Sequence, residues 1–192
     1  MKLNLPNKLT VFRIAMVPVF LLAAVALPLS DTVSRIVCAA IFAVTSITDL
    51  FDGKIARKYN LVTDFGKFMD PLADKFIVFA ALLAVLVKYD YLRSVFVWAA
   101  AIVMFRELAV TSVRLVAAGK EGLVIAASWL GKVKTALQMT CIITIFLEPV
   151  ILPFKIFTEY HVLSYLTVLA MTVMTLWSGI DYIKKYWKFI RP

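Results

Sequence analysis

Cysteine, histidine and acidic residues are scarce in this chain, whose 192 residues include two cysteines, one histidine and twelve aspartates and glutamates. Both cysteines, Cys38 and Cys141, lie inside apolar segments. A cysteine in such a segment usually packs as a small hydrophobic residue, so we expect no disulfide framework. The sequence also shows no internal repeat and no low-complexity tract, and the loops between its apolar segments are short. It therefore predicts a single domain over residues 1–192.

Basic residues outnumber acidic ones and give a formal net charge of +9, but no basic run stands apart from apolar sequence. That distribution argues against a protein that binds nucleic acid. The charge is better explained by membrane topology and by partners that carry phosphate, such as anionic lipids.

Apolar residues make up 62% of the chain, and the mean hydropathy is +0.90. A soluble domain of this length would not have so much apolar surface to place, so a membrane protein with several spans is favoured. Six segments have the length of about 20 residues that crosses the hydrocarbon core. The sequence therefore predicts an all-α integral membrane protein, a bundle of six transmembrane helices over Leu9–Leu29, Val33–Arg57, Asp70–Val87, Leu92–Ala118, Leu123–Leu147 and Leu163–Tyr186.

Lysines and arginines are distributed unevenly between the two sides of this predicted bundle. Most of those that flank the segments lie on the side of the two termini and of residues 49–74, and the opposite loops hold only Arg35, Lys88, Arg93 and Lys155. Loops rich in lysine and arginine stay in the cytoplasm. We therefore expect both termini and the 49–74 region at the cytoplasmic face.

Five of the twelve acidic residues fall between positions 49 and 74, at the inner ends of two apolar segments. Carboxylates within membrane segments are costly and usually mark a function. On a helix, Asp49, Asp52, Gly53 and Ala56 form one stripe at i, i+3, i+4 and i+7. The two acids could hold a cation, while the two small residues would let a bulky group approach the backbone.

The next segment repeats this arrangement, with Gly66, Asp70 and Asp74 at i, i+4 and i+8. Pro71 leaves open whether Asp70 caps that helix or lies in its first turn. Asp74 is 14 residues from the outer end of its segment, which corresponds to a depth of about 20 Å at 1.5 Å per residue. Asp49 and Arg106 lie at a similar depth, which indicates a polar cavity open to the cytoplasm.

Oxygen ligands without a nearby histidine or cysteine favour a hard cation such as Mg²⁺ or Mn²⁺ over zinc. Four carboxylates are enough for two ions about 3.5–4 Å apart, the usual spacing for clamping a phosphoryl group. Arg57, at the cytoplasmic end of the first stripe, could reach a phosphate with two hydrogen bonds. The alternative is a set of structural ion pairs with the neighbouring basic residues Lys54, Arg57, Lys67 and Lys75.

The pattern D-x2-D-G-x2-A-R-x8-G-x3-D-x3-D, which starts at Asp49 and ends at Asp74, resembles the signature of the CDP-alcohol phosphotransferase family, membrane enzymes of lipid head-group synthesis. The resemblance implies two divalent cations, held by Asp49, Asp52, Asp70 and Asp74. It also implies that Asp74 deprotonates the acceptor hydroxyl. The residues implied to line the nucleotide site are Gly53, Ala56, Arg57 and Gly66.

A second set of charges points to a phosphate on the acceptor. Arg106 lies in the middle of a predicted span, where it needs a partner, and the adjacent Glu107 projects about 100° away on a helix and is an imperfect one. A phosphorylated acceptor would explain why several cations gather near one base. The candidate cations are Lys75, Arg106, Arg114, Lys132 and Lys134. For Arg114, Lys132 and Lys134, simple anchoring at the cytoplasmic face is an equal alternative.

The resemblance narrows over residues 4–140 to bacterial members of the family that use sn-glycerol 3-phosphate as acceptor. It rests on the segments Asn4–Arg13, Gly66–Lys75, Arg106–Arg114 and Leu130–Thr135. The implied donor is CDP-diacylglycerol, and the implied products are phosphatidylglycerol phosphate and CMP. The resemblance also implies a homodimer in the bacterial plasma membrane, with its active site facing the cytoplasm.

The N-terminal segment has two interpretations. Asn7 could cap the first helix after Pro6, or it could belong to the pocket together with Thr10. Arg13 could line the cavity or extend to the interface.

Two other functions remain open. A divalent-cation transporter would use the aspartates as its binding site, although such proteins often show paired repeats, which this chain lacks. A relative in the same family could instead act on another head group, as a phosphatidylserine or cardiolipin synthase does.

Overall fold

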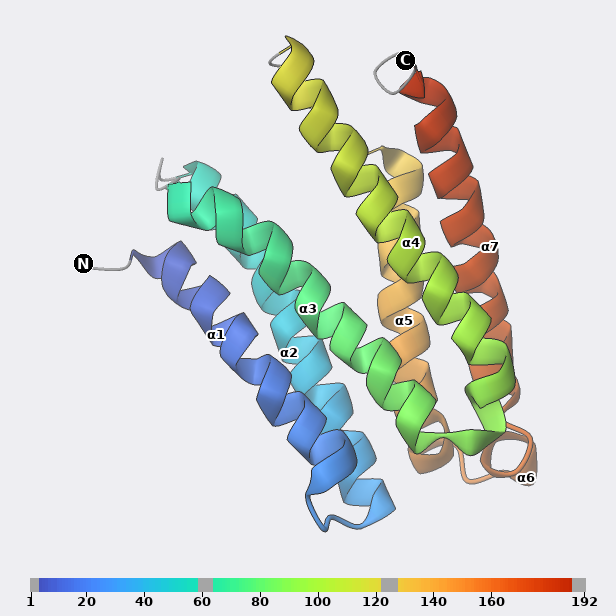
Figure 1. Ribbon diagram of the computed structural model, residues 1–192. Helices are drawn as coiled ribbons and strands as arrows, with labels where there is room; N and C mark the ends of the chain where they lie inside the picture. The colour runs from blue at the N-terminus through green and yellow to red at the C-terminus, as the bar shows by residue number, and fades with distance from the viewer. Residues whose placement is uncertain (1–3, 59–63, 122–127, 188–192) are drawn as a thin grey trace.

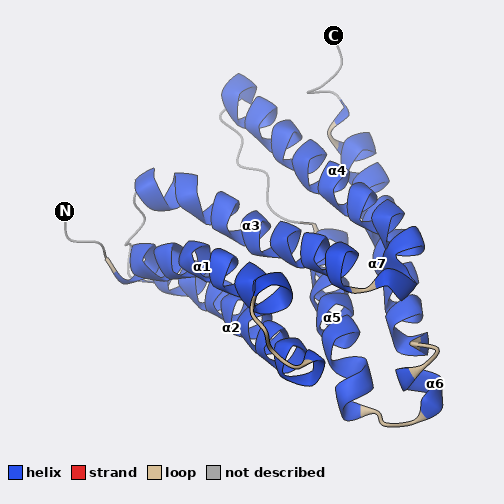
Figure 2. Ribbon diagram, turned by 60° about the horizontal axis from the view of Figure 1, so that its bottom comes forward, coloured by secondary structure: helices blue, strands red, loops and turns tan. Residues whose placement is uncertain are grey.

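The structure is a computed structural model that describes residues 4–58, 64–121 and 128–187. Within those ranges it leaves aside the side chains of residues 5, 6, 50–58, 64, 65, 67, 68 and 118–121. The described chain is helical throughout, apart from short turns, and contains no strand (Figure 2). The predicted all-α class is therefore confirmed.

The helices follow one another with short connections. They are α1 (Leu5–Leu21), a π-helical turn η1 (Leu22–Ala26), α2 (Asp31–Lys58), α3 (Asp64–Lys88), α4 (Asp90–Glu121), α5 (Trp129–Ile151), the short α6 (Lys155–Thr158) and α7 (Val162–Lys185).

Five stretches among the described residues are long and apolar enough to cross a membrane, which supports a membrane protein. They lie in α1 with η1, in α2, in α4, in α5 and in α7. α3 has 25 residues, enough for a span, but its inner half carries Asp70, Asp74 and Lys75. The count of six transmembrane helices therefore stays a prediction, because α3 qualifies by length and not by composition.

The helices alternate in direction, so that α1 begins and α7 ends at the same end of the bundle (Figure 1). α1 packs against α2 and α3, α5 packs against α2 and α7, and α4 packs against α3 and α7. The inner ends of α2 and α3, which carry the aspartates, lie at the end where α1 begins. This arrangement agrees with the predicted alternation of the chain across the membrane.

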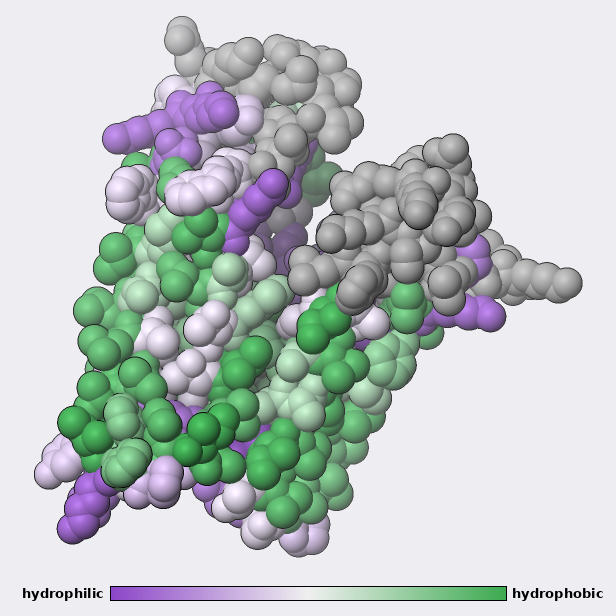
Figure 3. All heavy atoms as spheres, turned by 180° about the vertical axis from the view of Figure 1, so that it is seen from behind, coloured by the Kyte–Doolittle hydropathy of each residue, from purple (hydrophilic) through white to green (hydrophobic). Residues whose placement is uncertain are grey.

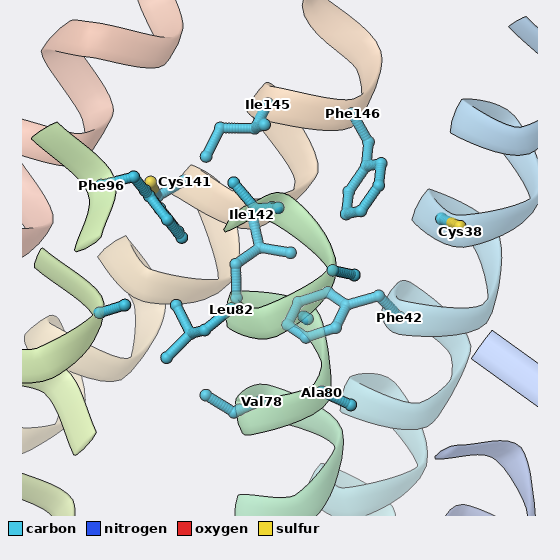
Figure 4. Close-up of a cluster of buried hydrophobic side chains, with 14 of the residues drawn as sticks. Cys38, Phe42, Val78, Ala80, Leu82, Phe96, Cys141, Ile142, Ile145 and Phe146 are labelled. Carbon is cyan, nitrogen blue, oxygen red and sulfur yellow. The ribbon is translucent and has the colours of Figure 1, made fainter. Parts of the chain in front are cut away.

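Buried apolar side chains from several helices meet in the middle of the bundle (Figure 4). Phe20 of α1 packs edge-on against Phe146 of α5, with ring centroids 5.9 Å apart. Cys38 and Cys141 are buried there as free thiols, which confirms the packing role predicted for them. The core thus connects the α1–α3 group to α5.

The outward surface of the bundle is apolar across its middle. On the face shown in Figure 3, hydrophobic side chains cover the central part, and hydrophilic ones gather toward the two ends. Trp98, Phe105 and Trp177 are each more than 60% exposed. Large apolar side chains exposed in such number fit a surface that contacts lipid.

Two predictions about helix starts are wrong. α1 begins at Leu5, with Asn4 in the capping position, so Asn7 is not the cap. Proline is compatible with the first helical turn, and Pro6 therefore does not delay the helix. α3 begins at Asp64, so that Asp70 is neither a cap nor a first-turn residue.

The fifth predicted span also differs at its ends. α5 begins at Trp129, and Ser128 caps it by accepting a hydrogen bond from the Gly131 amide at 3.1 Å. It continues to Ile151, beyond the predicted end at Leu147. The predicted start at Leu123 lies outside the described residues.

Candidate functional site

The aspartates lie on two neighbouring helices, with Asp49 on α2 and Asp70 and Asp74 on α3. α2 is helical through Lys58, which gives its part of the motif the predicted spacing along one helical face. Gly66 is buried at the inner end of α3. The side chains of the remaining motif residues lie outside the described ones: Asp52, Gly53, Ala56 and Arg57.

The first helix supplies two polar side chains to these aspartates. The Thr10 hydroxyl donates to Asp70 Oδ1 at 2.5 Å. Arg13 donates to Asp49, and its Nη2 lies 3.7 Å from Asp70 Oδ1. Arg13 is only 1% exposed, so it lines the site and does not extend to the interface. Thr10 and Arg13 are three residues apart on α1, which puts them on one face of that helix. Asn7, one turn earlier, is also buried.

The chemistry of this cluster fits hard divalent cations. Its acidic groups supply only oxygen donors, and a carboxylate in a membrane segment needs a compensating positive charge. The described side chains alone contain no group of three or more acidic, histidine or cysteine residues around a common point. Arg13 supplies positive charge to both Asp49 and Asp70 in this arrangement.

Glu107 of α4 is the centre of a second group of charges. It forms an ion pair with Lys134 of α5, which is 2% exposed, and it accepts from Arg106 Nη1 at 3.1 Å. Glu107 is therefore a close partner of Arg106, contrary to the expectation from their angular separation. Both side chains are long enough to fold toward each other from adjacent positions.

A cavity of about 30 Å³ joins this second group to Asp74. Its charged lining residues are Asp74, Lys75, Glu107 and Lys134, and Gln138 closes part of its wall. The lining residues come from three consecutive helices, α3, α4 and α5. A candidate base thus shares one small cavity with two cations and their partner carboxylate.

The five candidate cations separate into two groups. Lys75, Lys134 and Arg106 lie at or beside the cavity, where Lys75 donates to the Thr111 hydroxyl. Arg114 instead reaches α7, where its Nε donates to the Tyr182 hydroxyl at 3.2 Å. Lys132 is exposed in the first turn of α5. The structure therefore puts Lys75 and Lys134 in one cavity with Asp74, and Arg106 is joined to that cavity through Glu107.

Two glycines leave room for Arg106. A methyl group added at Gly179 of α7 would lie 3.1 Å from Arg106 Cγ, and one added at Gly131 of α5 would lie 3.6 Å from Arg106 Nη2. Both glycines are helical, so their role here is close approach and not backbone freedom. The Arg106 side chain consequently lies between α5 and α7.

Four residues that contribute to this site were not predicted from the sequence. Thr111 follows Glu107 by four residues, and Gln138 follows Lys134 by four residues. Both therefore share a helix face with a charged residue, which is a signal that the sequence contains. From the sequence alone, Glu107 is only an imperfect partner of Arg106. Nothing in the sequence links Gly179 to Arg106.

The sequence comparisons agree with one another. The family model described as CDP-alcohol phosphatidyltransferase matches residues 3–180. A Bacillus subtilis protein named CDP-diacylglycerol–glycerol-3-phosphate 3-phosphatidyltransferase is 40% identical over 98% of this chain and 97% of its own length. An Escherichia coli K12 protein with the same name is 38% identical over 95% of this chain and 94% of its own. A Mycobacterium tuberculosis protein named probable phosphatidylglycerophosphate synthase is 40% identical over 95% of this chain and 81% of its own.

Proposed function

This chain belongs to the CDP-alcohol phosphatidyltransferase family, and we propose that it transfers the phosphatidyl group of CDP-diacylglycerol to sn-glycerol 3-phosphate. The products are phosphatidylglycerol phosphate and CMP, and the reaction is a step of phospholipid biosynthesis. The names of relatives that match nearly the whole chain support this assignment.

The observation that carries the proposal is the shared cavity of Asp74, Lys75, Glu107 and Lys134. An acceptor with a phosphate needs cations, and its reacting hydroxyl needs a base nearby. Lys75 and Lys134 are within reach of the same small space as the Asp74 carboxylate, and Arg106 is joined to it through Glu107. A neutral acceptor such as serine would not require three cations at this point.

Asp49, Asp52, Asp70 and Asp74 are the proposed holders of two divalent cations, Mg²⁺ or Mn²⁺. When bound, the cations stabilise negative charge on the donor pyrophosphate and on the departing CMP. The spacing of Asp49 and Asp52 along helical α2, and the closeness of Asp49 to Asp70 through Arg13, support this assignment. Gly53, Ala56, Arg57 and Gly66 are the proposed residues of the nucleotide site.

Asp74 acts as the general base in this mechanism. It accepts the proton of the 1-hydroxyl of glycerol 3-phosphate, and that oxygen attacks the β-phosphorus of the donor in line. The bond from the β-phosphorus to the bridging oxygen breaks, and CMP departs with that oxygen. Lys75, Arg106 and Lys134 hold the acceptor phosphate, so that the hydroxyl is oriented toward Asp74. Arg114 and Lys132 attract the acceptor from farther away.

The proposed location is the bacterial plasma membrane, with the site open to the cytoplasm. A water-soluble acceptor must reach Asp74 from an aqueous phase, while the acyl chains of the donor stay in lipid. The lysines near the end of α7, at the same end of the bundle as the aspartates, support this orientation. A homodimer is proposed from the family resemblance.

A head-group assay tests the function. Purified protein in detergent micelles receives CDP-diacylglycerol, Mg²⁺ and, in separate reactions, glycerol 3-phosphate, serine or phosphatidylglycerol. We expect CMP release with glycerol 3-phosphate at least 100 times faster than with either alternative, since only that acceptor brings a phosphate monoester to the cations. Fastest release with serine would indicate phosphatidylserine synthesis, and fastest release with phosphatidylglycerol would indicate cardiolipin synthesis.

A further inference from the structure

Gln138 is a buried polar residue that the proposed reaction does not yet use. It lies on α5, one helical turn beyond Lys134, and lines the cavity that contains Asp74. Its side chain is 3% exposed, and its Oε1 has no hydrogen-bond partner among the described residues. A buried amide oxygen without a hydrogen-bond donor is energetically unfavourable. At the wall of a candidate substrate cavity, a bound ligand could supply the missing donor.

Most other polar groups of the cavity are charged, and the neutral one, the Thr135 hydroxyl, already donates to the Gly131 carbonyl of its own helix at 3.0 Å. Lys134 and Lys75 suit a phosphate, and Asp74 suits a hydroxyl that loses its proton. A neutral amide can both donate and accept a hydrogen bond, which suits a hydroxyl that keeps its proton.

We propose that the Gln138 amide binds the non-reacting hydroxyl of the acceptor, which makes Gln138 a residue that determines acceptor specificity. This inference rests on the proposed function, in which glycerol 3-phosphate carries its secondary hydroxyl on the carbon next to the reacting one. With the phosphate on the cations and the 1-hydroxyl at Asp74, the secondary hydroxyl lies at the remaining polar wall of the cavity. The hydrogen bond fixes which way the three-carbon chain faces.

The test compares glycerol 3-phosphate with 3-hydroxypropyl phosphate, which has the same phosphate and reacting hydroxyl but lacks the secondary one. For the wild-type protein we expect kcat/KM to be roughly tenfold or more lower with the analogue, because the buried amide is then left unpaired. Gln138→Leu should lower kcat/KM for glycerol 3-phosphate by a similar factor and change it less than about twofold for the analogue. Gln138→Met repeats the test with an unbranched side chain of similar volume.

A thermal melt of each variant shows whether it is folded, and we expect Tm to be unchanged or higher since an unpaired buried amide is removed. Thr140→Val is the matched control, because Thr140 is exposed on the same helix and its hydroxyl donates to the Ala136 carbonyl of that helix. Both substrates should keep their wild-type kinetics with this variant.

Equal losses for both substrates in the folded variants would mean that Gln138 is structural, which overturns the inference. Wild-type protein that uses both substrates equally well would overturn it too. Wild-type protein that releases no CMP with either substrate would overturn the proposed function itself, and the inference with it.

Discussion

At the scale of single residues, the site depends on a few buried charges with defined partners. Arg13 supplies positive charge to Asp49 and Asp70, and Glu107 joins Arg106 to Lys134. Breaking a buried charge pair leaves an uncompensated charge, which costs more than the pair contributes. The arrangement therefore joins the proposed metal-binding acids to α1 and the proposed acceptor cation Lys134 to α4.

Arg106 and Arg114 provide a paired prediction for the acceptor site. Arg106→Ala should raise the KM for glycerol 3-phosphate by roughly tenfold to a hundredfold, because a charge-assisted hydrogen bond to phosphate contributes about 1.5–3 kcal/mol. Arg114→Ala should raise it by less than about threefold, since Arg114 contacts Tyr182 of α7, whereas Arg106 contacts Glu107 of the cavity wall. Steady-state CMP release at varied acceptor concentration measures both values. An unchanged KM for Arg106→Ala would remove Arg106 from the acceptor site.

At the scale of helices, the contact between α4 and α7 holds Arg106 in place. Gly179 of α7 leaves space for the Arg106 side chain, and an apolar groove of about 320 Å³ runs beside them between the two helices. Gly179 therefore lies in close contact with a side chain of the proposed acceptor site.

Gly179→Ala tests that contact. Its added methyl group lies 3.1 Å from Arg106 Cγ, so either the helix or the side chain must shift. We expect KM for glycerol 3-phosphate to rise by roughly fivefold to a hundredfold with kcat changed less, because overpacking of this kind costs about 1–3 kcal/mol. Leu169→Ala is the control, since Leu169 lies on the same helix and is 61% exposed. Kinetics of Gly179→Ala that match the wild type would show that Arg106 adapts freely.

Helices were the part of the molecule that the sequence predicted best. Their apolar length and the spacing of Asp49 with Asp52 are local features, and both agree with the structure. The predicted start of the first helix was wrong because a proline such as Pro6 is compatible with the first turn of a helix as well as with the loop before it. The closeness of Arg13 to Asp49 could not be predicted, because it depends on how α1 packs against α2 and α3. The same holds for Gly179 and Arg106, which one sequence cannot link.

At the scale of the whole molecule, the two ends of the bundle differ in chemistry. The acids and acceptor cations lie toward the end where α1 begins. The opposite end has a structural cluster, in which Arg35 donates to Asp31 at 2.5 Å and to the Ile145 carbonyl at 3.2 Å and stacks over the ring of Tyr89. Burial raises the pKa of the Tyr89 hydroxyl, so that it stays protonated at neutral pH. The proposed reaction belongs to the other end of the bundle.

The orientation of the bundle gives a prediction for the intact cell. Lys184→Cys lies at the end of the proposed active site, and Lys155→Cys lies at the opposite end. A membrane-impermeant maleimide should label Lys155→Cys from the periplasmic side of spheroplasts and should label Lys184→Cys only after lysis. The native Cys38 and Cys141 are buried, so the unsubstituted protein serves as the control with little labelling. Labelling of Lys184→Cys in intact spheroplasts would place the active site on the wrong side for its acceptor.

The proposed mechanism depends most on Asp74, a proposed metal ligand and base that lines the cavity with Lys75 and Lys134. The most direct measurement is CMP release by purified Asp74→Asn protein supplied with CDP-diacylglycerol, glycerol 3-phosphate and Mg²⁺, together with its Tm. Loss of a general base typically slows a reaction by about 10²–10⁴-fold, so we predict at least a hundredfold fall in kcat. Tm should stay close to that of the wild-type protein, because asparagine has nearly the same shape as aspartate. Turnover within tenfold of the wild type, in a protein that remains folded, would contradict the account.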